Sequence, residues 1–128
     1  MKTIVVAYND TNDSDRALDR AAELAGFYGA RVVVTSVVPV MIGGTMPNGA
    51  GPELEQAGAR LRERGVEAEL VEAVGEIAEA IIEVADSRGA DLIVVGTREL
   101  SQVERFLGHS VSEGVQRMAR CDVLIVHS

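Results

Sequence analysis

The sequence is short of two residues on which many binding sites depend, lysine and cysteine. Lys2 is the only lysine, and the formal net charge is -8 at pH 7. Because duplex binding relies on Lys and Arg to displace counterions, we expect neither nucleic acid nor an anionic membrane as a partner. Cys121 is the only cysteine, which excludes an intrachain disulfide and a thiolate zinc cluster. We expect it to be a buried structural thiol.

Long hydrophobic runs are also missing. The apolar run near the N-terminus, residues 4–8, is far too short for a membrane span or a signal-peptide core, so we expect a cytoplasmic protein. With 128 residues, 47% of them apolar and 25% charged, the chain has the length and composition of one globular domain that folds alone.

Several catalytic motifs are absent as well. The sequence contains no G-x-x-x-x-G-K-[ST], no G-x-G-x-x-G after its first strand and no G-x-S-x-G. P-loop enzymes, dinucleotide dehydrogenases and hydrolases with a nucleophile elbow are therefore unsupported. A receiver domain is excluded because no acidic residue ends the central strand and no lysine ends the last one. We predict no catalytic residue and no metal site formed by the protein alone.

Apolar runs rich in Val and Ile recur along the chain without polar alternation, which is typical of parallel strands covered on both faces. The segments between them carry apolar residues at helical spacing. The pattern predicts strands at 3–8, 31–38, 66–73, 91–96 and 122–127, and helices at 13–28, 52–64, 76–88 and 110–119. The expected helix ends are an N-cap at Asn12, Asp13 or Ser14, an early Pro52, and stops at Gly29, Gly65 and Gly89.

The third strand differs from the others because Glu67 and Glu69 alternate with apolar residues, as expected at a sheet edge. With that strand at an edge, the fold is a doubly wound, Rossmann-like α/β sheet of five parallel strands in the order 3-2-1-4-5, with helices on both faces. Ligands of such sheets bind beyond the carboxyl ends of the first and fourth strands. The long loop 39–51, with four glycines, is either a lid over that site or a flexible connection.

Three stretches resemble the universal stress protein family, and together the resemblance covers essentially the whole chain. They are "GADLIVVGTR" (89–98), "SVSEGVQRMARCDVLIV" (110–126) and, more weakly, "IVVAYNDTNDSDRAL" (4–18). Nucleotide-binding members carry Gly, two residues, Gly, nine residues, Gly and then Ser or Thr. Gly96 and Ser110 match the outer positions, whereas Glu99 and His109 stand at the two inner glycines.

A second family feature is an Asp-Gly-Ser stretch after the first strand, in which the Asp contacts the nucleoside. This sequence has Asn9, Asp10 and Thr11 there, and Asn can still form hydrogen bonds. The resemblance implies a small regulatory module that binds ATP or another adenine nucleotide, with Mg²⁺. The implied nucleotide-binding residues are Ala7, Asn9, Val38, Gly96, Thr97, Arg98, Gly108, His109, Ser110 and Val111.

The interpretation of loop 96–110 stays open. If a nucleotide binds, its phosphates would lie between Gly96 and the start of the last helix, where unpaired N–H groups favour an anion, and its sugar or base would lie near Asn9 and Val37–Val38. Glu99 would repel a phosphate unless Arg98 and Arg105 offset its charge or its side chain points outward, and Gly108 could replace His109 in a shifted register. The alternative is a universal stress protein that binds no nucleotide and acts as a dimeric interaction module, with Ser110 merely an N-cap. An enzyme with slow nucleotide hydrolysis ranks third.

The last strand predicts a homodimer. It would form the second sheet edge, and no charge follows Asp122 to protect it from pairing. A two-fold contact through residues 122–127 would close this edge, as the resemblance also implies. We expect His127 at the rim of that contact or on the surface.

Overall fold

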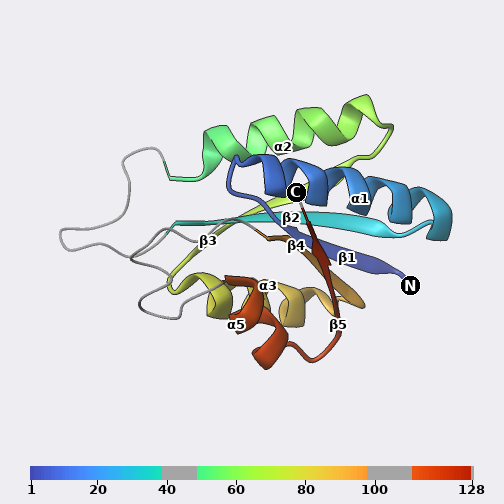
Figure 1. The fold of residues 1–128 in the computed structure, drawn as a ribbon. Helices are drawn as coiled ribbons and strands as arrows, with labels where there is room; N and C mark the ends of the chain where they lie inside the picture. Colours follow the sequence, from blue (N-terminus) through green and yellow to red (C-terminus); the bar gives the residue numbers. More distant parts are fainter. Residues whose placement is uncertain (39–48, 98–110, 128) are drawn as a thin grey trace.

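The computed structural model describes residues 1–38, 49–97 and 111–127 (Figure 1). Five parallel strands form one sheet in the order β3-β2-β1-β4-β5, which confirms the predicted topology. The elements are β1 (Thr3–Ala7), α1 (Asn12–Tyr28), β2 (Arg31–Val38), α2 (Gly51–Glu63), β3 (Ala68–Val74), α3 (Ile77–Arg88), β4 (Leu92–Gly96), α5 (Val111–Met118) and β5 (Asp122–Val126).

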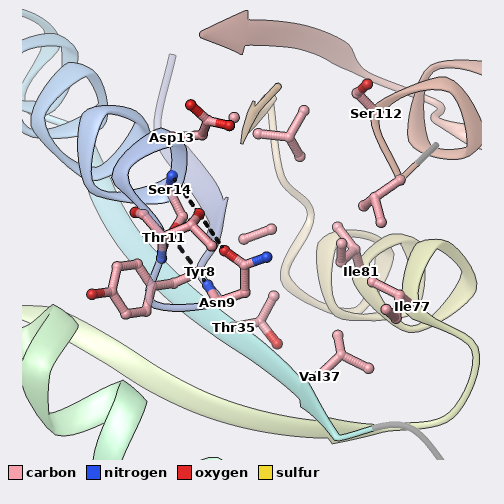
Figure 2. Close-up of a pocket in the computed structure, with 14 residues that line it drawn as sticks. Tyr8, Asn9, Thr11, Asp13, Ser14, Thr35, Val37, Ile77, Ile81 and Ser112 are labelled. Carbon is pink, nitrogen blue, oxygen red and sulfur yellow. Dashed lines mark hydrogen bonds between the residues drawn. The ribbon is translucent and has the colours of Figure 1, made fainter. Parts of the chain in front are cut away.

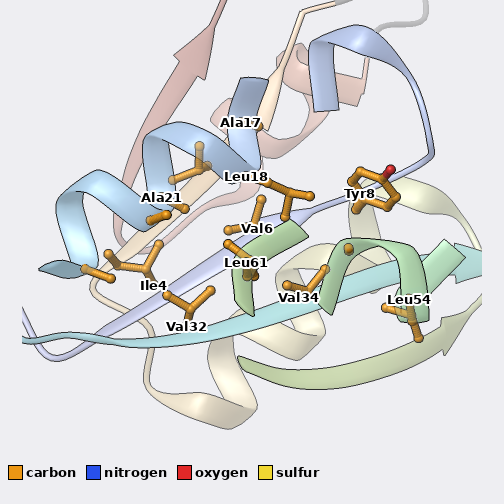
Figure 3. Close-up of a cluster of buried hydrophobic side chains, with 14 of the residues drawn as sticks. Ile4, Val6, Tyr8, Ala17, Leu18, Ala21, Val32, Val34, Leu54 and Leu61 are labelled. Atoms are coloured by element: carbon orange, nitrogen blue, oxygen red, sulfur yellow. The ribbon is translucent and has the colours of Figure 1, made fainter. Parts of the chain in front are cut away.

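Helices cover the sheet on both faces, with α1 and α2 on one side and α3 and α5 on the other (Figure 1). Successive strand residues point to opposite faces of the sheet, so each central strand contributes side chains to both hydrophobic cores. Ile4 and Val6 pack under α1 and α2, as Figure 3 shows, whereas Val5 packs with α3 and α5. This double burial is the reason that the central strands contain uninterrupted apolar runs.

The start of α1 corrects the sequence prediction. Thr11, rather than Asn12, Asp13 or Ser14, is the N-cap. Its Oγ1 accepts a hydrogen bond from the Ser14 backbone N–H at 3.2 Å, and the Ser14 hydroxyl accepts one from the Thr11 N–H at 3.0 Å. Ser14 is therefore the third helical residue of a capping box, in which a serine replaces the usual Glu or Gln.

The helix stops and the sheet edges follow the sequence pattern more closely. Gly29 and Gly89 cap α1 and α3 with φ of 66° and 61°, the left-handed conformation that glycine adopts without strain. β3 is an edge strand as predicted, although it begins at Ala68 instead of residue 66. Cys121 is only partly buried, whereas the sequence predicted a buried thiol, and this partial burial raises the pKa of the thiol.

β5 forms the other edge of the sheet. Its central residues Val123, Leu124 and Ile125 are partly exposed, and Val126 is buried. Among the described residues, no helix is long and apolar enough to span a membrane.

Candidate functional site

A cavity lies at the carboxyl ends of β1 and β4, the position at which the winding of the sheet reverses (Figure 2). Seven segments contribute to it: the end of β1, the β1–α1 connection, the start of α1, β2, the start of α3, the end of β4 and the start of α5. The described lining residues are Ala7, Tyr8, Asn9, Thr11, Asp13, Ser14, Thr35, Val37, Ile77, Ile81, Val95, Gly96, Val111 and Ser112.

The lining divides into an apolar part and a polar part. Val37, Ile77 and Ile81 form an apolar wall where β2 meets α3 (Figure 2). Asn9 and Thr11 contribute amide and hydroxyl groups from the β1–α1 connection on the other side. A largely apolar cavity with a few converging polar groups is the usual form of a small-molecule site. This lining suits a flat apolar ring attached to a hydroxyl-bearing group.

The β1–α1 connection is held by a small hydrogen-bond network. The Asn9 N–H donates to the Ser14 hydroxyl at 3.3 Å, and the same hydroxyl accepts from Thr11 N–H. Asp10, which lies between Asn9 and Thr11, has a φ of 58°, the single positive φ of a non-glycine residue in the described part of the chain. Asp tolerates this left-handed conformation better than most residues. Asp10 stands where the family pattern has glycine, so the loop keeps a glycine-like path without a glycine.

Asn9 has its side-chain orientation set by Thr11. The Thr11 hydroxyl donates to Asn9 Oδ1 at 2.7 Å. Because the carbonyl side of the amide is occupied, its NH₂ group is left to face a ligand, and Figure 2 shows Asn9 pointing into the cavity. Asn9 therefore offers hydrogen-bond donors where an aspartate would offer only acceptors.

Gly96, the last residue of β4, lies directly against the start of α1. A Cβ atom at this position would lie 2.6 Å from the carbonyl carbon and oxygen of Asp13 and 2.8 Å from Asp13 Cβ. Real Cβ atoms essentially never make contacts this close. Glycine is therefore required at residue 96 by packing alone, whether or not a phosphate binds there.

Tyr8 points to the opposite face of the sheet and is 2% exposed (Figure 3). Its hydroxyl donates to Asp15 Oδ1 at 2.9 Å and accepts from Gln56 Nε2 at 2.9 Å, while Gln56 also donates to Asp10. Burial, followed by the Asp15 carboxylate, raises the Tyr8 pKa well above its ordinary range. Tyr8 stays protonated and ties the β1–α1 connection to α2.

The structure brings together some of the predicted site residues. Ala7, Asn9, Gly96 and Val111 line the cavity. Of the two residues expected near the sugar or base at the end of β2, Val37 lines the cavity, whereas the Val38 side chain packs in the core under α1 and α2.

The remaining predicted residues do not line the cavity or cannot be placed. Thr97 donates its N–H to the Val126 carbonyl at 2.9 Å, which extends the pairing of β4 with β5. Arg98, Glu99, Gly108, His109 and Ser110 lie outside the described residues, as does most of the 39–51 loop that we considered as a lid.

Sequence reasoning missed several lining residues, including Asp13, Thr35, Ile77 and Ile81. The period-2 pattern of β2 contained a usable signal, because Thr35 and Val37 share a face of that strand. Ile77 and Ile81 read as an ordinary apolar helix stripe, and no local pattern separates a cavity wall from a core. Among the described residues, no group of three or more His, Cys, Asp or Glu side chains could hold a metal ion.

Comparison with known proteins gives one consistent family. The model of the universal stress protein family matches residues 1–127. A universal stress protein of Mycobacterium tuberculosis strain H37Rv is 32% identical over 148 residues, which cover 99% of this chain and 97% of the relative.

Solved structures are similar over the same length. A universal stress protein in complex with cAMP has a TM-score of 0.82 and 30% identity, covering 98% of this chain and 97% of the other. One from Archaeoglobus fulgidus in complex with dAMP has a TM-score of 0.81 and 30% identity, with 98% of both chains covered.

Proposed function

Because the chain belongs to the universal stress protein family, we propose that it is a cytoplasmic regulatory module that binds an adenine nucleotide in the cavity at the ends of β1 and β4. The observation that carries this proposal is the lining of the cavity, apolar on the β2 and α3 side and polar on the β1–α1 side. The similar structures with cAMP and dAMP support the choice of an adenine compound.

The described residues fit the three parts of such a ligand, which are its base, its sugar and its phosphates. The apolar wall of Val37, Ile77 and Ile81 would take the adenine ring, which gains most of its binding energy by burying its faces. The Asn9 amide and nearby hydroxyls would bind ring nitrogens or sugar oxygens. Phosphates would lie toward Gly96 and the start of α5, whose first N–H groups attract anions, with Mg²⁺ balancing a polyphosphate.

The direct test is equilibrium binding of adenosine, cAMP and ATP, the last with and without Mg²⁺, to the parent protein and to Asn9→Ala. We expect saturable binding to the parent and a loss of about 2–12-fold in Asn9→Ala, the value of one ordinary hydrogen bond. Asn12→Ala is the matched control, since Asn12 is exposed, begins α1 and is not among the lining residues. Equal losses in both variants, or no saturable binding to the parent, would refute the proposed site.

The second candidate is a dimeric interaction module that needs no nucleotide, and β5 is the observation that favours it. This edge strand carries partly exposed Val123, Leu124 and Ile125 and an unpaired outer side among the described residues. Two copies that pair through β5 would cover it, and the homodimer is compatible with either function. Light scattering at tens of micromolar should show a dimer, and Val123→Lys with Ile125→Lys should give monomers. A monomeric parent would contradict the pairing.

A further inference from the structure

Asp13 is a charged residue in the cavity wall that takes no part in the capping hydrogen bonds of α1, although the helix dipole favours an acidic side chain so close to the N-terminus of a helix. It lies in the first turn of α1 and is 8% exposed. No hydrogen bond or ion pair joins its carboxylate to any other residue in the described part of the chain. In the capping box the Thr11 hydroxyl accepts from the Ser14 N–H and the Ser14 hydroxyl accepts from the Thr11 N–H, so Asp13 is not the cap. Its carboxylate oxygens stay accessible, because no fully buried side-chain oxygen or nitrogen among the described residues lacks a hydrogen-bond partner.

Its surroundings make this charge unusual. Of the 14 described residues that line the cavity, Asp13 is the one with a formal charge, and none is Lys or Arg. Figure 2 shows it beside Ser14 at the edge of the cavity where β4 ends. The backbone of Asp13 also lies against Gly96, the last residue of β4, which places Asp13 at the end of that strand. The proposed phosphate position is therefore next to a negative charge that no cationic side chain among the described lining residues balances.

From this placement we propose that Asp13 determines which phosphorylation state the cavity accepts. Its carboxylate disfavours bare polyphosphates and leaves nucleosides unaffected, so ATP binds well only with a divalent cation to balance the two negative groups. For a cyclic or simple monophosphate, the loss of affinity caused by Asp13 should lie between that for a nucleoside and that for a bare polyphosphate. This inference rests on the proposed adenine-nucleotide site.

The test compares adenosine, AMP and ATP by calorimetry in EDTA, with the parent, Asp13→Asn and Asp10→Asn. Asp13→Asn removes the charge with little change of shape, and we expect ATP affinity to rise about tenfold while adenosine affinity stays within about twofold. Asp10→Asn is the matched control. It changes the net charge equally and close by in the sequence, but Asp10 does not line the cavity, and its side chain accepts hydrogen bonds from Gln56 and the Tyr8 hydroxyl on the opposite face of the sheet. It should leave the ratio of ATP to adenosine affinity within about twofold.

A second measurement uses the parent protein and does not depend on how well a variant folds. Adding Mg²⁺ should increase ATP affinity in the parent by about tenfold and leave adenosine affinity unchanged. In Asp13→Asn that gain should shrink, provided that thermal melts show the variant to be folded.

The outcomes separate the two proposals. An ATP-to-adenosine ratio that is the same in the parent and Asp13→Asn, or that shifts as much in Asp10→Asn, overturns the role of Asp13 and leaves the nucleotide site standing. Failure of Mg²⁺ to improve ATP binding by the parent also overturns it. No binding of any of the three ligands to either protein overturns the nucleotide site, and the role of Asp13 with it.

Discussion

Substituting Gly96 by alanine tests whether this glycine is kept for packing against α1. The added methyl carbon would lie 2.6 Å from the carbonyl carbon and oxygen of Asp13 and 2.8 Å from its Cβ. None of these atoms is the end of a flexible side chain, so relief requires β4 or the start of α1 to move. The capping box of Thr11 and Ser14 holds the start of α1 in place.

The expected cost follows from that geometry. Overpacking a well-packed site costs about 1–3 kcal/mol, and we expect Gly96→Ala near the upper end because its neighbours are backbone atoms. The φ of Gly96 is not positive, so the conformation itself suits alanine and the whole effect is steric. The same movement would displace Asn9 and Asp13, so ligand affinity should fall together with stability.

Urea unfolding of the parent and the variant measures this free energy directly. Gly26→Ala serves as the control, because Gly26 lies in α1 without a positive φ, and a methyl group added there would meet no atom within 4 Å beyond its own helix backbone and chain neighbours. Alanine there should stabilise the protein by about 0.5–1 kcal/mol. If Gly96→Ala lost less than about 0.5 kcal/mol, the close approach of β4 to α1 would not be a constraint, and a role in ligand binding would become the better reason for this glycine.

Three further perturbations follow from the described contacts and from the sequence. Arg60 donates two hydrogen bonds of 2.9 Å to the Asp19 carboxylate and lowers its pKa, with desolvation acting in the opposite direction. A lowered pKa in the folded state stabilises the protein above the unfolded value, about 3.9, and this contribution is lost as the pH falls through the folded pKa. Asp19→Asn should therefore cost about 0.5–1.5 kcal/mol in urea unfolding at pH 7, a range reduced for the partial exposure of the pair, and much less once the pH falls below the folded pKa of Asp19. The exposed pair of Arg20 and Glu23 provides the control, with Glu23→Gln expected within about 0.5 kcal/mol of the parent. Tyr8→Phe removes the hydroxyl that joins Asp15 and Gln56 and should cost about 1 kcal/mol, and an unchanged urea midpoint would show that this contact is not stabilising. Glu99→Gly combined with His109→Gly restores the two glycines of the family motif and should raise ATP affinity by about tenfold, with a smaller gain for adenosine in the same calorimetric titration; equal ATP affinity would mean that these residues are not the obstacle.

The amino-acid sequence by itself determined the architecture of this protein. Uninterrupted Val and Ile runs identify strands buried on both faces, and the alternating Glu67 and Glu69 identify one edge. From these, the right-handed βαβ rule leaves the observed strand order as the natural solution. The sequence also predicted the end of α1 at Gly29, because a glycine that ends a helix acts through its own backbone and its near neighbours.

The tertiary structure alone decided the details of the candidate site. Successive residues of β2 point to opposite faces of the sheet, so Val37 lines the cavity and Val38 packs in the other core. Which of the two faces the cavity depends on which face of β2 meets α3. The contact of Gly96 with Asp13 joins residues far apart in sequence, so no local pattern reports it. Asp13 resembles any acidic residue in the first turn of a helix until the fold places it in the cavity wall beside the end of β4. Local propensities determine elements and their order, whereas the chemistry of the cavity depends on which side chains the packed elements bring face to face.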